Sequence, residues 1–218
     1  MSENVYRIKI PVSQIKNLKN DQRFILILRL SRFINQLSFC HQAYLEVGNG
    51  KKPTDFRHLH NSFLFSCAIL YEALKFYPKL GKEFLNFNSH KDGFAKLSKH
   101  PDFDFVKNKI VNTMRNEFIY HVDEGPFINA LKQYGERSVD FLLSKSDQHG
   151  DIYYALADEL ALNYIIGEHD TDEIAAQYYQ EMSQKIMNIM VEFIHNANKL
   201  IMEYVNRKHW KVDEKNIS

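Results

Sequence analysis

The residues best suited to do chemistry in this chain lie within ten positions, 114–123, with the sequence MRNEFIYHVD. Arg115 and Asn116 are adjacent, and His121 follows five residues after the asparagine. Arginine stays cationic and presents a planar fork that matches phosphate oxygens, while histidine titrates near neutral pH, at a pKa of about 6.5. The arginine–histidine spacing alone is expected roughly once by chance in such a chain, and requiring the asparagine lowers this to about a tenth.

These three residue types fit the cleavage of RNA. RNA carries its own nucleophile, the ribose 2′-OH, so that cleavage needs one group to move protons and another to neutralise the phosphorane charge. His121 is the candidate acid or base, Arg115 the phosphate binder, and Asn116 a polar group that binds phosphate or ribose or positions the histidine. A structural interpretation stays open. In it Arg115 forms a salt bridge within the protein, and His121 ends a helix near its C-terminal dipole.

Other chemistries find less support in the sequence. His58 and His60 are two residues apart, about 200° on a helix, so they cannot bind one metal from one face. The two cysteines, Cys40 and Cys67, form no Cys-x-x-Cys pair and are expected to be buried thiols in a reducing cytoplasm. Neither a Gly-x-Ser-x-Gly elbow nor a glycine-rich phosphate loop occurs. We therefore expect neither a metal nor a cofactor.

The composition is that of one globular domain. The chain has 218 residues, 44% hydrophobic and 25% charged, with only eight Gly and five Pro, which favours a helical protein. We expect a single domain over residues 1–218, with its core at about 20–207. The N-terminus lacks the apolar core of a signal peptide, and the most apolar run, 24–30, contains Arg29. A cytoplasmic protein that does not enter the membrane is predicted.

Charge is unevenly distributed along the chain, although its net value is only +1. Residues 1–32 carry seven basic and two acidic side chains, whereas residues 136–181 carry eleven acidic and two basic ones. A phosphate-binding surface would therefore lie in the first two-thirds of the chain. The alternative is that both regions are ordinary solvated surfaces.

The elements that must position the motif are long helices. Apolar residues recur at helical steps over 21–47 and from Pro53 to 77, where Pro78 is expected to end the helix, and the two helices suit an antiparallel pair. Shorter helices are expected near 81–87 and 93–100. The motif then falls in the last turns of a helix that begins near Asp102 or Asp104.

The rest of the chain reads as further helices with one exception. Residues 127–134 and 156–166 form short helices, and Asp170 to about Arg207 forms a helix on the order of 50 Å long. Residues 139–155 place a polar turn between two apolar runs, which predicts a small β-hairpin. The fold class is thus mainly all-α.

Helix geometry sets a condition on the motif. Six residues separate Arg115 from His121, which on an ideal α-helix is about 120° and 9 Å along the axis. One helix does not aim both side chains at one point. We therefore expect either that the helix ends near Tyr120 or that a second copy of the chain completes the site.

Arg115, Asn116 and His121, late in a helix of an all-helical bundle, resemble the motif of the HEPN superfamily, which is an arginine, four to six residues, and then a histidine. The long helix pair before the motif is most similar to the abortive-infection-like branch. In branches paired with nucleotidyltransferase antitoxins a tyrosine stands two residues after the histidine, whereas this chain has Asp123.

The resemblance implies a metal-independent endoribonuclease that acts as a toxin or phage-defence effector, with its active site at the meeting of two motif helices in a homodimer. It implies His121 as acid or base, Arg115 as phosphate binder and Asn116 as supporting group. RNA, a second copy of the chain, and an antitoxin or other neutralising protein are the expected partners. Many members have lost activity, so the alternative is a non-catalytic, antitoxin-like or nucleotide-binding module in which Arg115 and His121 are structural.

Overall fold

The computed structural model describes residues 3–46, 53–120, 124–134, 155–167 and 172–217. Nearly all of them are helical, which confirms the expected mainly all-α fold. The α-helices are α1 (Val12–Leu18), α2 (Gln22–Glu46), α3 (Pro53–Phe84), α4 (Ala95–Leu97), α5 (Val111–Met114), α6 (Glu124–Tyr134), α7 (Ala155–Ile166) and α8 (Asp172–Arg207). Three π-helical turns, η1 (His90–Phe94), η2 (Phe105–Ile110) and η3 (Arg115–Tyr120), and two strands, β1 (Glu3–Lys9) and β2 (Lys211–Ile217), complete the described elements.

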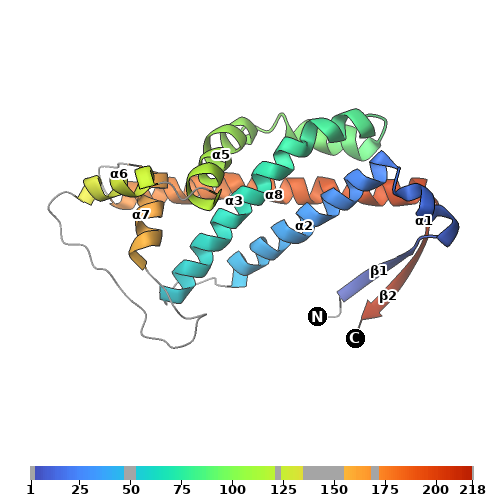
Figure 1. Ribbon diagram of the computed structural model, residues 1–218, viewed down its shortest axis with the longest axis horizontal. Helices are drawn as coiled ribbons and strands as arrows, with labels where there is room; N and C mark the ends of the chain where they lie inside the picture. Colours follow the sequence, from blue (N-terminus) through green and yellow to red (C-terminus); the bar gives the residue numbers. More distant parts are fainter. Residues whose placement is uncertain (1–2, 47–52, 121–123, 135–154, 168–171, 218) are drawn as a thin grey trace.

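Helices α2 and α3 form the expected antiparallel pair and lie side by side along most of their length (Figure 1). Asp21 directly precedes α2 and caps it, since its carboxylate accepts a hydrogen bond from the N–H of Phe24 at 3.1 Å. Proline has no backbone N–H, and at the first position of α3 this costs no hydrogen bond, because an N–H there would have no partner within the helix. The predicted starts of both helices are therefore confirmed.

The prediction that Pro78 ends the second helix is wrong, because α3 continues through it to Phe84 and includes most of the separate helix expected at 81–87. Proline removes one backbone hydrogen bond and crowds the carbonyl four residues earlier. Pro78 itself is exposed, while Leu74, Leu80 and Phe84 on the buried face are fully buried. Their burial, at about 1.5–3 kcal/mol per side chain, offsets the cost of the proline.

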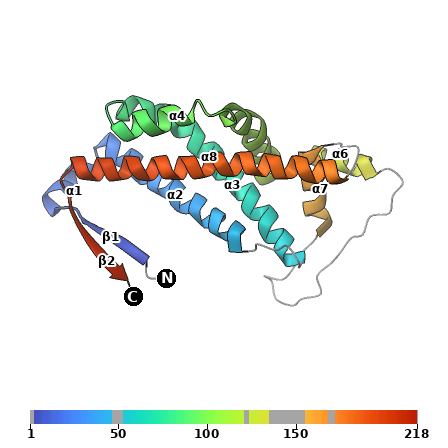
Figure 2. The ribbon, with the colours of Figure 1, turned by 180° about the vertical axis from the view of Figure 1, so that it is seen from behind.

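Helix α8 is the predicted long helix, and at 36 residues it is about 54 Å long. It runs nearly the whole length of the molecule and crosses behind α2 and α3 (Figures 1 and 2). Its buried side chains recur at steps of three and four, with Ile186, Ile189 and Phe193 fully buried. Aromatic rings continue the core toward its C-terminal end, where Tyr204 packs on Phe84.

The two strands were not foreseen from the sequence. β1 and β2 pair antiparallel over their whole length, from Glu3 opposite Ile217 to Lys9 opposite Lys211. They extend away from the helices next to α1 and bring the two ends of the chain together (Figure 1). The hairpin predicted at 139–155 lies outside the described residues, apart from Ala155, which begins α7.

Two further sequence predictions concern buried side chains. Cys40 and Cys67 are buried free thiols, as expected, and burial raises the pKa of both. His58 is exposed and His60 is buried, so they face opposite sides of α3 as their spacing predicts. Within the described ranges, no helix is both long and apolar enough to span a bilayer.

The helix that carries the motif differs from the regular α-helix that was expected. It consists of the π-helical turn η2, one α-helical turn α5 and the π-helical turn η3. Val106 and Val111 are both fully buried although five residues place side chains about 140° apart on an α-helix. Hydrogen bonding from residue i to i+5 stacks such positions and so lets both reach the core.

Candidate functional site

Arg115 begins η3 and points across to α3. Its Nη2 lies 3.3 Å from Oε1 of Glu72, and its guanidinium lies 5.1 Å from the centre of the Tyr71 ring. About a quarter of the Arg115 side chain is exposed. Arg115 is therefore held by an ion pair and a cation–π contact while one part of it remains open to solvent.

Asn116 is held by two hydrogen bonds that run through its carboxamide. Its Oδ1 accepts a hydrogen bond from Nη1 of Arg115 at 2.7 Å, and its Nδ2 donates to Oδ1 of Asn112 at 3.1 Å. Asn112 lies one turn earlier, on α5. The chain Asn112–Asn116–Arg115 fixes the orientation of both motif side chains, which is the positioning role that a carboxamide can perform without adding charge.

The local fold places these polar residues because their neighbours are anchored in the core. Val111 and Met114 are buried to 1% exposure or less and pack α5 against α3. Arg115 and Asn116 follow directly and lie at the edge of that contact, where they are half-buried. The buried neighbours thus fix the backbone from which the two polar side chains extend.

Residues from two other helices complete the surroundings of the motif. Burial and a hydrogen bond with Glu117 raise the pKa of Tyr164 on α7. Nζ of Lys75 lies 5.2 Å from the centre of the Tyr71 ring, so that ring has a lysine and an arginine beside it. We call the residues around the motif arginine the Arg115 cluster, which consists of Tyr71, Glu72, Lys75, Asn112, Arg115 and Asn116.

Of the three predicted site residues, the structure brings Arg115 and Asn116 into direct contact. His121 lies outside the described residues. The separation of 120° calculated for Arg115 and His121 assumed a continuous α-helix, whereas residues Arg115–Tyr120 form a π-helical turn. The geometry of the arginine–asparagine half of the motif is therefore described, and that of the histidine half stays a prediction.

Sequence reasoning missed Tyr71, Glu72 and Lys75. One signal was present: between Asp55 and Glu83, Glu72 is the only acidic residue in a long apolar helix. A lone carboxylate at such a place is often paired with a cation from another element. Nothing in the sequence identified Arg115 as that cation.

A cavity of about 230 Å³ lies next to the motif helix, lined in part by Lys109, Thr113 and Met114. Tyr164 and Tyr178 contribute its aromatic walls. In the described part of the chain, no group of three or more His, Cys, Asp or Glu side chains lies close enough to hold a metal ion.

Comparison of the chain with protein-family models, with curated proteins and with solved structures finds no match.

Proposed function

We propose that this chain is a HEPN-like endoribonuclease that cleaves RNA without a metal ion, as a toxin or phage-defence effector. The observation that carries the proposal is that two cations, Arg115 of the motif and Lys75 of α3, lie over the same ring, that of Tyr71, and so lie close to one another. Two cations held close together can contact neighbouring phosphates of one RNA strand. Asn116, bonded to the arginine, fixes the direction of its fork.

Each motif residue has one task in this proposal. Arg115 binds the scissile phosphate and stabilises the charge that develops on its oxygens. His121 accepts the proton of the ribose 2′-OH or donates one to the leaving 5′-oxygen. Asn116 positions Arg115. A second copy of the chain supplies the other half of the site in a cytoplasmic homodimer, and a neutralising protein restrains it.

The test is cleavage of single-stranded RNA by the purified full-length chain with EDTA present. We expect products that end in a 2′,3′-cyclic phosphate, because the attacking group is the 2′-OH. His121→Ala and Arg115→Ala should each lower the rate at least about 100-fold. The assay is paired with growth of cells that express the same variants.

Two matched controls separate a catalytic loss from a general one. Arg29 on α2 also lies over an aromatic ring, that of Phe76 at 4.5 Å, and Arg29→Ala should keep full cleavage. His195 is an exposed histidine on α8, and His195→Ala should do the same. Undiminished cleavage by His121→Ala would overturn the assignment.

One observation favours a second function, that of a non-catalytic interaction module. Arg115 already has a carboxylate partner in Glu72, which is what a structural arginine requires. In that case the protein cleaves no RNA, and Arg115→Ala lowers the free energy of unfolding without a change in any RNA-dependent readout. Urea denaturation, measured beside the cleavage assay, distinguishes the two functions.

A further inference from the structure

An apolar groove of about 360 Å³ runs between α2 and α3, and the described residues that line it all belong to these two helices. Its apolar lining consists of Phe39 and Cys40 from α2 and of Phe65 and Ile69 from α3. Phe39 is 71% exposed and Phe65 is 54% exposed, although phenylalanine is among the residues most often buried. Two exposed aromatic side chains along one groove indicate a surface that a partner covers.

The apolar surface continues along α2 toward its N-terminal end. Ile25 is 37% exposed and Leu28 is 50% exposed. At 100° per residue, Ile25, Leu28, Arg32, Gln36 and Phe39 lie within a sector of about 80° around the helix axis, and the stretch is about 21 Å long. We call this stripe and the groove together the α2–α3 surface, which consists of Ile25, Leu28, Arg29, Arg32, Phe39, Phe65 and Ile69.

The charge on the α2–α3 surface has one sign. Arg32 is the only ionic side chain among the described residues that line the groove, and Arg29 is exposed one turn before it. From residue 22 to residue 45, α2 contains neither Asp nor Glu. Glu72 of α3 forms its ion pair with Arg115. A partner that covers this surface therefore needs carboxylates beside its apolar side chains.

An α-helix is the element that fits a groove between two neighbouring helices. The side chains of a third helix can pack along such a groove, with apolar residues at steps of three and four. An extended peptide would instead need the edge of a sheet for its backbone hydrogen bonds. A second copy of the chain, packed by the same surface, would set arginines against arginines, which is unfavourable.

We propose that the α2–α3 surface binds an acidic amphipathic helix of another protein. The apolar side chains of that helix pack on Phe39, Phe65 and Ile69, and its carboxylates pair with Arg29 and Arg32. The α2–α3 surface shares no residue with the Arg115 cluster, so the proposal does not depend on RNA cleavage.

The experiment measures binding of synthetic helical peptides to the full-length protein, by calorimetry and without RNA. Two peptides of about 18 residues, long enough to cover the surface, carry leucines on one face and either glutamates or lysines on the other. We expect saturable binding of the glutamate peptide. The lysine peptide should bind at least about tenfold more weakly, because like charges then meet at the arginines.

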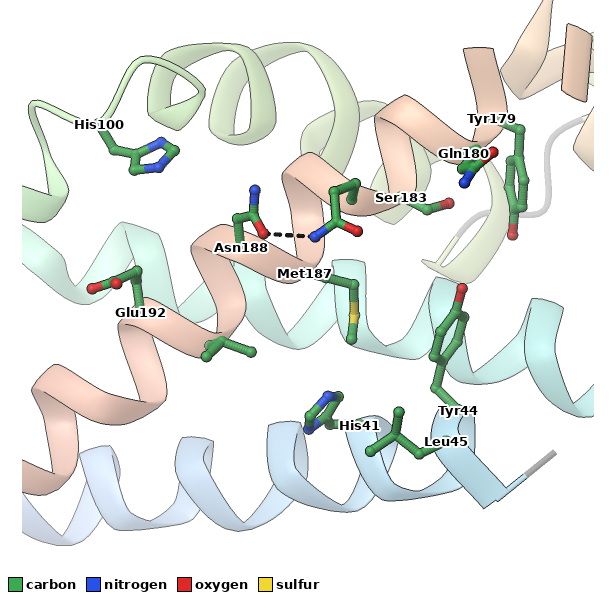
Figure 3. A pocket seen from close by; sticks show the side chains of 12 residues that line it. His41, Tyr44, Leu45, His100, Tyr179, Gln180, Ser183, Met187, Asn188 and Glu192 are labelled. Atoms are coloured by element: carbon green, nitrogen blue, oxygen red, sulfur yellow. Dashed lines mark hydrogen bonds between the residues drawn. The ribbon is translucent and has the colours of Figure 1, made fainter. Parts of the chain in front are cut away.

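Apolar variants test whether the peptide occupies the groove. Phe39→Ala and Phe65→Ala should each weaken binding of the glutamate peptide about tenfold or more, as aromatic anchors do. Leu45→Ala is the matched control and should bind normally. Leu45 is 62% exposed on the same helix, but it lines a different groove, between α2 and α8 (Figure 3).

Charge variants test the proposed ion pairs. A protein with both Arg29→Glu and Arg32→Glu should prefer the lysine peptide to the glutamate peptide. A protein with both Lys91→Glu and Lys199→Glu is the matched control, since these exposed lysines lie on η1 and α8 and the net charge changes equally. It should keep the original preference. Circular dichroism confirms that each variant is folded.

Any of three results overturns the proposal. One is the absence of saturable binding by the glutamate peptide. Another is equal binding by Phe39→Ala and Leu45→Ala, or an unchanged peptide preference after the arginines are reversed. The third is self-association in sedimentation experiments that Phe39→Asp abolishes, because a second copy then covers the surface. RNA cleavage is measured separately without peptide, so failure of either proposal leaves the other standing.

Discussion

Replacing Gly93 with alanine tests whether the close contact between η1 and α8 holds the bundle together. Gly93 is buried, and a Cβ atom at this position would lie 2.5 Å from Oδ1 and 2.8 Å from Cγ of Asn196. Both distances are shorter than real Cβ atoms show. Asn196 is only 4% exposed, and its Cβ would also lie 3.2 Å from the added atom, so rotation of its carboxamide alone does not relieve the contact.

The cost follows from these contacts. Extra volume in a packed interior destabilises by about 1–3 kcal/mol, because neighbours leave their rotamers or the backbone shifts. For a chain of this size, 1 kcal/mol changes the melting temperature by about 2–4 °C. A loss of about 2 kcal/mol, the middle of the free-energy range, should therefore lower the Tm of Gly93→Ala by roughly 4–8 °C.

The assay is thermal and urea denaturation followed by far-UV circular dichroism. Gly81→Ala is the matched control: its Cβ would meet Nε2 of His90 at 3.6 Å, an ordinary contact, and alanine favours a helix interior by up to about 1 kcal/mol. The two substitutions should therefore have opposite signs. Asn196→Ala should recover part of the loss in a double-mutant cycle. A Gly93→Ala protein as stable as the parent would refute the close packing of η1 on α8.

Three further predictions concern stability. Burial lowers the pKa of His60 to about 4, so the free energy of unfolding should fall by about 3 kcal/mol as pH drops from 6.5 to 4. Urea titrations at both pH values measure this fall. His60→Gln should abolish it, whereas His58→Gln, at an exposed position, should leave it unchanged. Burial opposes ionisation of Glu203, but hydrogen bonds from Ser89 and neighbouring groups outweigh it and hold its pKa at about 2. Its contribution is therefore present above pH 4.5 and lost as pH falls toward 2, and Glu203→Gln should lower stability at pH 7 but flatten this acid limb. Pro78→Ala should raise the free energy of unfolding by about 1–3 kcal/mol, because it restores a backbone hydrogen bond inside α3. Unchanged stability would contradict this and would show that the helix is already kinked to fit the proline ring.

The long helices could be predicted because their signals are local. Pro53 and Asp21 mark helix starts, and apolar residues at steps of three and four continue through α8 to Arg207. The end of α3 could not be predicted from Pro78, since what carries the helix past it is burial of Leu80 and Phe84 in contacts with other elements. Propensity is a weak prior when tertiary packing opposes it.

The strands and the Arg115 cluster depend on partners distant in sequence. β1 and β2 lie at opposite ends of the chain, so no turn signal links them. Glu72 and Arg115 are forty-three residues apart and meet because α5 packs on α3. The sequence singled out Arg115 and Asn116 as candidate site residues, whereas their partners could be identified only from the fold.

The ion pair between Arg115 and Glu72 is compatible with phosphate binding, because exchange of partners costs little. Both side chains are a quarter or more exposed, and such pairs contribute about 0–1 kcal/mol. A phosphate offers the arginine fork two charge-assisted hydrogen bonds, and water can solvate the released carboxylate of Glu72, which is more than a third exposed. Glu72→Gln should therefore preserve or strengthen RNA binding if Arg115 is a phosphate ligand. If Arg115 is structural, the same substitution should only lower the free energy of unfolding, and weaker RNA binding by a fully folded Glu72→Gln protein would contradict the exchange.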